Sequence, residues 1–190
     1  MLQRASELDI FVRIDMESSR HTQATLDLFR AALAAHGNRR VGIVIQAYLY
    51  RSEEDVRQLA SEGCSIRLCK GAYMEPPEVA FPRKSEVNRN FCRLADLMLS
   101  CSGYSAFATH DDAMIRHVCQ VVSERGIDSD RYEFQMLYGI RRERQLELTQ
   151  QGHRMRVYVP FGTEWVPYYI RRLAERPANL LFIVKNLFRR

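Results

Sequence analysis

Six short runs rich in β-forming residues alternate with longer segments of helical spacing, and this alternation limits the fold more than any other feature. The β-rich runs cover residues 10–15, 41–48, 65–70, 105–109, 132–136 and 155–159. Apolar residues recur every three or four positions in segments 19–36, 87–99, 111–125 and 162–176, as in amphipathic helices. Parallel neighbours need a crossover, and a helix is the usual one. The pattern therefore predicts an α/β fold with a parallel sheet.

The number of units leaves two architectures open. A complete (β/α)8 barrel typically needs about 250 residues, or roughly 31 per strand–helix unit. Six units of that size fill the 190 residues of this chain. The chain can therefore form an open, doubly wound sheet of six strands or a barrel that lacks two units, and the residue pattern does not distinguish them. The length predicts a single domain over residues 1–190.

Composition excludes several classes of protein. Hydrophobic residues make up 46% of the chain and charged residues 27%, which is typical of a globular domain and excludes collagen-like and disordered chains. The five cysteines are an odd number without a Cys-x-x-Cys pair. This argues against a disulfide framework or a zinc knuckle and favours a reducing compartment. No apolar stretch reaches the roughly 18 residues of a membrane span, and the first residues do not resemble a signal peptide.

The chain carries a formal charge of +5, with 28 Lys and Arg against 23 Asp and Glu. Such an excess can indicate an acidic partner. The arginines are interspersed with acidic residues, however, which is typical of solvated helix faces. The net positive charge by itself still leaves one alternative to an enzyme, a non-catalytic basic module that binds RNA, anionic lipid or another protein.

Polar residues stand at or near the carboxyl end of every predicted strand. In chain order they are Asp15, Gln46, Lys70, Thr109 with His110, Gln135 and Tyr158. Barrels and open α/β sheets both place their ligands at the carboxyl ends of the strands. The repeated placement predicts a ring of polar residues around a pocket.

Common nucleotide-binding and hydrolase motifs are absent from the sequence. It contains no Gly-x-Gly-x-x-Gly, Walker loop, Gly-x-Ser-x-Gly or His-Glu-x-x-His, so Rossmann, P-loop, serine-hydrolase and zincin functions lose their usual support. The segment RLCKGAY at 67–73 instead sends two cations, Arg67 and Lys70, out of an apolar strand. Gly71 and Ala72 beside them are small enough for a ligand to approach the backbone. Alternatively, the two cations could cap the carboxyl end of a neighbouring helix.

Seven segments resemble, in order, the motifs of the proline dehydrogenase family. They are IDMES at 14–18, VIQAY at 44–48, RLCKGAY at 67–73, FATH at 107–110, YEFQMLYG at 132–139, RVYVPFG at 156–162 and YIRRLAER at 169–176. The resemblance runs from about residue 10 to the end and implies strands three to eight of a (β/α)8 TIM-type barrel. The family's first two strand–helix units, with a substrate-binding lysine on the second strand, have no counterpart here. The chain therefore resembles a truncated member.

The resemblance also implies a function. Family members bind FAD at the carboxyl rim of the barrel and oxidise L-proline to 1-pyrroline-5-carboxylate by hydride transfer to the flavin N5, the first step of proline catabolism. They pass the electrons to a quinone. We therefore expect a cytoplasmic FAD enzyme, with peripheral contact to the inner membrane as a further option, and no metal or nucleic acid. An inactive fragment of such an enzyme is the alternative.

Catalytic and cofactor positions follow from the matched motifs. Asp15 and Arg67 correspond to active-site residues, with Arg67 beside the flavin N5, where a permanently charged guanidinium can stabilise negative charge. Asp15 could instead cap the following helix. The cofactor-binding positions implied by the resemblance are Met16, Gln46, Arg67, Lys70, Gly71, Ala72, Thr109 and His110.

The resemblance implies a substrate pocket as well. Tyr73, Leu137 and Tyr158 match its walls, and Tyr158 resembles members that prefer proline to hydroxyproline. Arg171 and Arg172 match the pair that binds the substrate carboxylate. They would stand about 100° apart on one helix, which suits two-sided binding of a carboxylate.

Two further positions depart from the family or lie beyond its motifs. Asp111 stands where the family usually has Asn, which adds a charge close to the predicted cofactor site. The terminal segment 179–190 is apolar-rich but too short to span a bilayer. A helix that covers the substrate mouth is its family-like interpretation, and peripheral membrane contact is the alternative.

Overall fold

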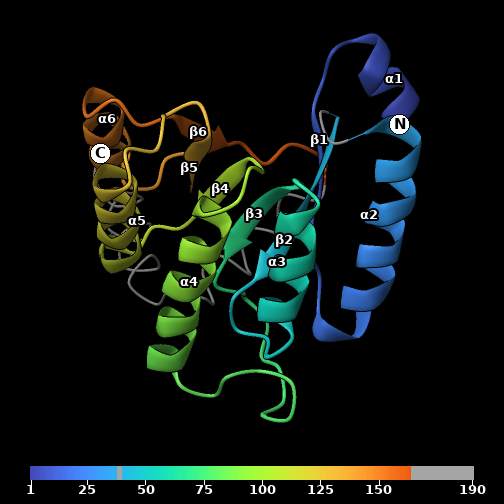
Figure 1. Cartoon of the computed structure of the whole chain (residues 1–190), viewed down its shortest axis with the longest axis horizontal. Coiled ribbons are helices and arrows are strands. Elements are labelled where there is room, and N and C mark those ends of the chain that lie inside the picture. Colours follow the sequence, from blue (N-terminus) through green and yellow to red (C-terminus); the bar gives the residue numbers. More distant parts are fainter. Residues whose placement is uncertain (38–39, 164–190) are drawn as a thin grey trace. The chain divides into compact units, whose positions relative to one another are not determined.

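The computed structural model describes residues 1–37 and 40–163. The strands of this part are β1 (Val12–Ile14), β2 (Val41–Gln46), β3 (Ser65–Cys69), β4 (Ser105–Ala108), β5 (Tyr132–Leu137) and β6 (Met155–Tyr158) (Figure 1). The helices are α1 (Leu2–Glu7), a 3-10 turn η1 (Ser19–His21), α2 (Thr22–His36), α3 (Ser52–Ser61), α4 (Lys84–Leu99), α5 (Asp112–Glu124) and α6 (Arg142–Gln150). All six predicted strands are therefore confirmed, each within a few residues of its expected ends.

The chain divides into two compact units, residues 1–157 and 158–190. The helices named above and the sheet up to residue 157 belong to the first unit. The expected single domain over residues 1–190 stays a prediction. In the part that the structure describes, no helix is long and apolar enough to cross a membrane.

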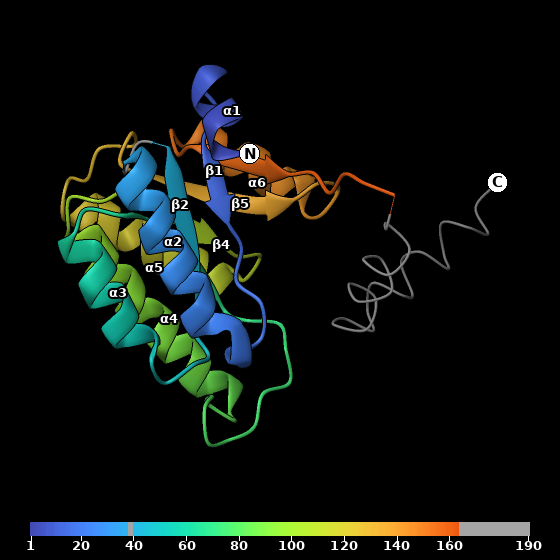
Figure 2. The same cartoon turned by 90° about the vertical axis from the view of Figure 1, so that its right-hand side faces the viewer.

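The strands lie in the sheet in the order in which they occur in the chain, from β1 to β6. The pairs β1–β2, β2–β3, β3–β4 and β4–β5 are all parallel. Because crossovers between parallel strands have one hand, an order that never reverses places successive helices on the same face of the sheet. Figure 2 shows α2, α3, α4 and α5 on one side of it. A doubly wound sheet would reverse at a switch point, so the order favours the barrel type.

Apolar side chains fill the space between the sheet and the helices. Side chains alternate between the two faces of a strand, and the helix-facing row pairs Ile43 with Ile66, Leu68 with Phe107, and Phe107 with Phe134. All of them are buried in one apolar cluster. The helices contribute its other large members, which include Phe29, Leu59, Phe91, Leu94 and Ile115.

The opposite face of the sheet, which we call the inner face, carries polar side chains. Its residues include Arg13, Val44, Gln46, Arg67, Ala106, Glu133 and Gln135, and Arg156 of β6 contacts Glu133 there. In a closed barrel this face lines the interior. The alternation of the strands therefore separates an apolar layer under the helices from a polar layer on the other side.

Gly42 of β2 lets an arginine cross the inner face. A Cβ at this position would lie 2.7 Å from Phe11 Cζ and 2.8 Å from Arg13 Nη1. Arg13 of β1 passes over Gly42 and donates to the backbone oxygen of Ser65 at 3.1 Å and to its hydroxyl at 3.1 Å. Burial of its guanidinium lowers the pKa of Arg13 to about 10. One side chain thus links three neighbouring strands.

The helices divide into those that the periodicity predicts and those that it misses. Helices α2, α4 and α5 lie where apolar spacing predicts them, although 19–36 begins with the turn η1. The segments selected by their apolar spacing do not include helices α3 and α6. Leu148 is the one apolar buried residue of α6, which therefore has a weak periodic signal. In α3, by contrast, Val56, Leu59 and Ala60 have helical spacing, so this helix could be predicted from the sequence.

We predict that Phe107→Ala lowers the free energy of unfolding by about 3–5 kcal/mol, because its fully buried ring leaves a cavity between the sheet and the helices. Urea unfolding followed by circular dichroism measures the change. Tyr138→Ala, at a side chain that is 71% exposed, is the control and is expected to change stability by less than about 0.5 kcal/mol. Equal losses for both variants would contradict the assigned core.

Candidate active site at the carboxyl rim of the sheet

Parallel pairing brings most of the predicted site residues to one edge of the sheet. Asp15 and Met16 follow β1, Gln46 ends β2, and Lys70 to Ala72 follow β3. Thr109 and His110 follow β4, and Leu137 ends β5. Because parallel strands point the same way, their carboxyl ends meet at a common rim. The residues predicted at the carboxyl ends of β1 to β5 therefore lie along one rim of the sheet.

Arg67 reaches this rim from the inner face of β3. Its Nη2 lies 2.6 Å from Asp15 Oδ1, and its Nη1 donates to Gln135 Oε1 at 3.5 Å. The Arg67 side chain is 12% exposed, whereas that of Asp15 is 56% exposed. Asp15 also accepts from the backbone N–H of Met16 at 3.0 Å. In the described structure Asp15 therefore pairs with Arg67, which is at odds with the alternative that Asp15 caps a helix.

The Gln46 amide is buried with one polar atom unsatisfied. Its Nε2 donates to the backbone oxygen of Met16 at 3.5 Å. Its Oε1 has no hydrogen-bond partner among the described residues. A buried acceptor without a partner costs roughly 1–3 kcal/mol. A ligand N–H at the rim would satisfy it.

The ammonium group of Lys70 is bound by two other side chains of the protein. Its ammonium donates to Asn88 Oδ1 at 2.5 Å and to Asp111 Oδ2 at 2.7 Å. Asp111 in turn caps α5 by accepting from the backbone N–H of Ala113 at 2.9 Å. The hydrogen bond from Lys70 holds the pKa of Asp111 below its usual value. Lys70 thus fastens the end of β3 to the amino ends of α4 and α5, and not to a helix carboxyl end.

Gly71 allows the loop after β3 to pass against an aromatic ring. Its φ is +104°, and a Cβ there would overlap with the ring of Tyr48. The Tyr48 ring is buried, and its hydroxyl donates to Glu75 Oε1 at 3.3 Å. Glu75 also accepts from the backbone N–H of Ser19 at 2.7 Å and from its hydroxyl at 2.5 Å. This carboxylate therefore joins the segments that follow β1, β2 and β3.

The sequence does not predict the role of Glu75 as a junction. Tyr48 belongs to one of the quoted motifs, but Glu75 lies in a loop without periodicity. The same loop also returns to the end of β2, where Phe81 N donates to the Tyr48 backbone oxygen at 2.8 Å. The one sequence feature that could have indicated this role is the position of Glu75, an acidic residue four positions after the glycine that follows β3.

His110 and Thr109 connect the ends of β4 and β5. His110 Nε2 accepts from the backbone N–H of Leu137 at 3.0 Å. Arg141 donates to the His110 backbone oxygen at 2.6 Å, and Thr109 Oγ1 accepts from Asp111 N at 3.1 Å. These contacts fix the backbone at the rim between the two strands.

The predicted substrate residues are only partly described. The Tyr73 hydroxyl donates to Glu17, and the Tyr73 side chain is 40% exposed. Tyr158 belongs to the second compact unit. Arg171 and Arg172 lie outside the described residues, as does the segment 179–190. The predicted carboxylate-binding pair therefore stays a prediction.

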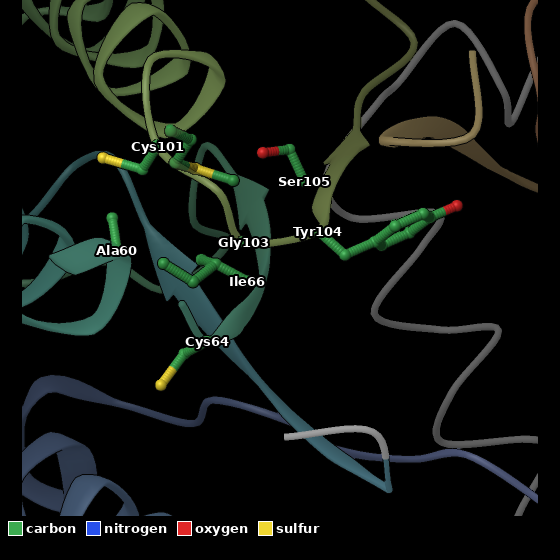
Figure 3. Close-up of a pocket in the computed structure, with 8 residues that line it drawn as sticks. Ala60, Cys64, Ile66, Cys101, Gly103, Tyr104 and Ser105 are labelled. Atoms are coloured by element: carbon green, nitrogen blue, oxygen red, sulfur yellow. The ribbon is translucent and has the colours of Figure 1, made fainter. Parts of the chain in front are cut away.

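A pocket lies at the opposite end of the strands from the rim and does not form a ligand site. Figure 3 shows its lining, which includes Cys64 and Cys101 beside the first residues of β3 and β4. Side chains pack it so closely that no volume is left for a water molecule. Burial raises the pKa of the Cys64 thiol to about 11. This thiol is therefore protonated at neutral pH and is a poor nucleophile.

Comparison with known proteins finds a family model and curated relatives that all carry the same description. A family model described as proline dehydrogenase matches residues 1–185. Proline dehydrogenase 1 of Bacillus subtilis (strain 168) is 46% identical over 190 residues, which cover 100% of this chain and 62% of that protein. Proline dehydrogenase of Deinococcus radiodurans is 42% identical over 189 residues, which cover 100% of this chain and 61% of that protein. The chain therefore spans less than two thirds of the length of these relatives.

Solved structures agree with this similarity. Proline utilization A from Bdellovibrio bacteriovorus, inactivated by N-propargylglycine, has a TM-score of 0.84 at 30% identity and covers 90% of this chain and 20% of that one. Proline utilization A from Corynebacterium freiburgense has a TM-score of 0.74 at 27% identity over 94% of this chain and 21% of that one. Together with the strand order, these matches confirm that the six strands belong to a fold of the barrel type and exclude the open, doubly wound alternative.

We predict that Gly71→Ala costs more stability than a left-handed backbone alone explains. The added Cβ must displace the Tyr48 ring, so we expect a loss of about 2–4 kcal/mol in urea unfolding. Gly152→Ala is the matched control, because Gly152 also has a positive φ, +86°, but no atom within 4 Å of an added Cβ. We expect about 1 kcal/mol there. Equal losses would contradict the contact with Tyr48.

We also predict that the charge of Asp111 stabilises the fold at neutral pH. Because its pKa is lowered in the folded state, its contribution is present above the ordinary carboxyl pKa and is lost as the pH falls through the folded value. Asp111→Asn keeps a capping oxygen but loses the charge. We expect it to lower the free energy of unfolding by about 1 kcal/mol at pH 7 and by much less near pH 3.

Urea unfolding at both pH values measures this difference. Asp27→Asn is the control, since Asp27 accepts from the neutral amide of Gln23 at 2.8 Å. It is expected to change stability little at either pH. A loss for Asp111→Asn that is the same at both pH values would show that the Lys70 contact does not depend on the charge.

Proposed function

Because this chain belongs to the proline dehydrogenase family, we propose that its carboxyl rim forms part of the FAD and substrate site of an enzyme that oxidises L-proline to 1-pyrroline-5-carboxylate. The observation that carries this proposal is the position of Arg67. Its guanidinium lies at the rim between Asp15 and Gln135, on a side chain that is mostly buried. A permanently positive group in such a position suits a reaction in which negative charge builds up on an acceptor.

The residues at the rim fit a flavin. The unpartnered Oε1 of Gln46 can accept a ring N–H, and its amide N–H can be shared with a ring oxygen. Gly71 and Ala72 expose backbone that a flat ring system can approach closely. The residues proposed to hold the cofactor are Met16, Gln46, Arg67, Lys70, Gly71, Ala72, Thr109 and His110. Of these, Lys70 contributes through the loop that it fastens, since its ammonium is already bound to Asp111 and Asn88.

FAD, when bound, supplies the hydride acceptor. The task of the protein is then to hold the substrate in one orientation and to stabilise the charge that develops. A guanidinium group is a permanent positive charge in proteins, and we assign Arg67 to charge stabilisation. Asp15 holds Arg67 in place through their 2.6 Å contact. The two residues therefore act as a unit, with the carboxylate orienting the guanidinium.

The family resemblance supports the remaining assignments. Tyr73, Leu137 and Tyr158 are proposed as the walls of the substrate pocket, with Arg171 and Arg172 as the groups that bind the carboxylate of proline. A quinone is proposed as the final electron acceptor of a cytoplasmic enzyme, which reaches it by peripheral contact with the inner membrane.

The full chain tests this proposal directly. We expect purified protein to show the absorbance of bound flavin and to reduce a dye when L-proline is added. Arg67→Met is expected to lower the rate of flavin reduction by proline on the order of 100-fold, because it removes a charge used in the transition state. Arg57→Met, which breaks a surface pair with Glu53, is the control and should change the rate little.

Two outcomes would contradict the proposal. If the purified protein bound no flavin at any concentration tested, this chain would have no FAD site. Protein that binds flavin but gives no proline-dependent reduction would favour the inactive fragment. In that case, salt-sensitive retention on RNA or on anionic vesicles would support the basic binding module.

A further inference from the structure

Glu133 of β5 is a buried carboxylate on the inner face and is surrounded by donors. It is 3% exposed. Its Oε1 accepts from Arg156 Nε at 2.7 Å and from Gln135 Nε2 at 2.5 Å. Its Oε2 accepts from Arg156 Nη2 at 2.8 Å and from the Tyr104 hydroxyl at 3.1 Å. The bidentate arginine and the tyrosine therefore leave the carboxylate little freedom to rotate.

The ionised form of this carboxylate is the stable one. Burial alone would raise the pKa of Glu133, but the hydrogen bonds from Arg156 and Gln135 outweigh burial and hold the pKa below its usual value. At neutral pH Glu133 is therefore an acceptor only. It faces Gln135 as a fixed negative charge.

Gln135 stands between a group that only accepts and a group that only donates. Its amide nitrogen must face the Glu133 carboxylate, since a carboxylate has no hydrogen to give. Its amide oxygen then points to Arg67, whose Nη1 lies 3.5 Å away. The orientation of this amide thus follows from the chemistry of its two neighbours. A rotated amide would bring its N–H groups towards the guanidinium and lose both contacts.

A small residue on β4 makes the connection from β3 to β5 feasible. Arg67 pairs in register with Ala106, and Ala106 pairs with Glu133. Neighbouring strands lie about 4.8 Å apart, so Arg67 must extend across β4 to reach Gln135. Ala106 has only a methyl group on this face. The long guanidinium side chain can therefore pass over it.

We propose that Glu133 is a positioning residue for the oxidation, which acts through Gln135 to hold the Arg67 guanidinium in its working orientation. This inference rests on the proposed function, because it assumes that Arg67 serves the reaction. Asp15 holds one side of Arg67, and the Glu133–Gln135 pair holds the other. Loss of the Glu133 charge should therefore loosen Arg67 without touching the substrate.

The first test needs no cofactor. The side-chain amide protons of Gln135 in the flavin-free full chain report the contact with Glu133, and Gln135→Leu assigns their NMR resonances. A short hydrogen bond to a carboxylate shifts such protons downfield, so Glu133→Gln should move them upfield. The matched control is Glu124→Gln, because Glu124 accepts from the Gln120 amide at 2.7 Å on the exposed face of α5. This control should leave the Gln135 resonances in place. Unmoved resonances in Glu133→Gln would overturn the proposal.

The second test uses the flavin-loaded chain. We expect Glu133→Gln to lower the rate of flavin reduction by proline about 10-fold, with the KM for proline within about twofold of the unaltered chain. Glu124→Gln should change neither quantity. If Glu133 had only a structural role, Glu133→Gln would instead lower the melting temperature and leave the rate of flavin reduction in the folded protein unchanged.

A double-mutant cycle separates the two kinds of role and covers the case in which Glu133→Gln folds poorly. Gln135→Leu breaks the link to Arg67 while it leaves the Glu133–Arg156 pair intact. If Glu133 acts through Gln135, the double variant should be no slower than Gln135→Leu alone. Rate losses that multiply would overturn the inference. An unaltered chain that proline does not reduce would contradict the proposed function, whereas the NMR test of the Glu133–Gln135 contact would still stand.

Discussion

Parallel pairing of consecutive strands is the constraint on which the other features depend. It sends the crossover helices α2, α3, α4 and α5 to the same face, where Phe107, Phe134 and their neighbours form one apolar cluster (Figure 2). Helices α2 to α5 therefore do not cover the inner face, where long polar side chains lie. The same pairing gathers the carboxyl ends of the strands at one rim. The apolar cluster that stabilises the fold and the candidate site thus both follow from one topology. They lie on different sides of the sheet.

The inner face carries buried charges that are stable because they are paired. An isolated buried charge costs several kcal/mol, and a partner with good geometry offsets this cost. Arg156 holds Glu133 in a bidentate contact, and Asp15 holds Arg67. Gln135 connects the two pairs through its amide. A network of this kind holds its members in defined orientations, which is the property that a site for charge stabilisation requires.

The loops at the rim are fixed by a separate set of contacts. Glu75 joins the segments after three strands, and Gly71 packs against the Tyr48 ring. Lys70 fastens the end of β3 to Asp111 at the start of α5. These contacts hold the backbone that is proposed to face the cofactor. The match to Proline dehydrogenase 1 of Bacillus subtilis covers the whole of the present chain and therefore includes these residues.

The sequence by itself determined the α/β class, all six strands and the family, because alternation and ordered motifs are local properties of the chain. It also placed Asp15, Gln46, Thr109 and His110 at strand ends, and parallel pairing then brought them together. Its apolar spacing gave no signal for α6, which has a single apolar buried residue. Only the tertiary structure decided that Lys70 binds Asp111 and that Glu133 reaches Arg67 through Gln135. Arg67 and Gln135 are 68 positions apart in the chain, and side chains so distant meet only where the folded sheet places their strands together.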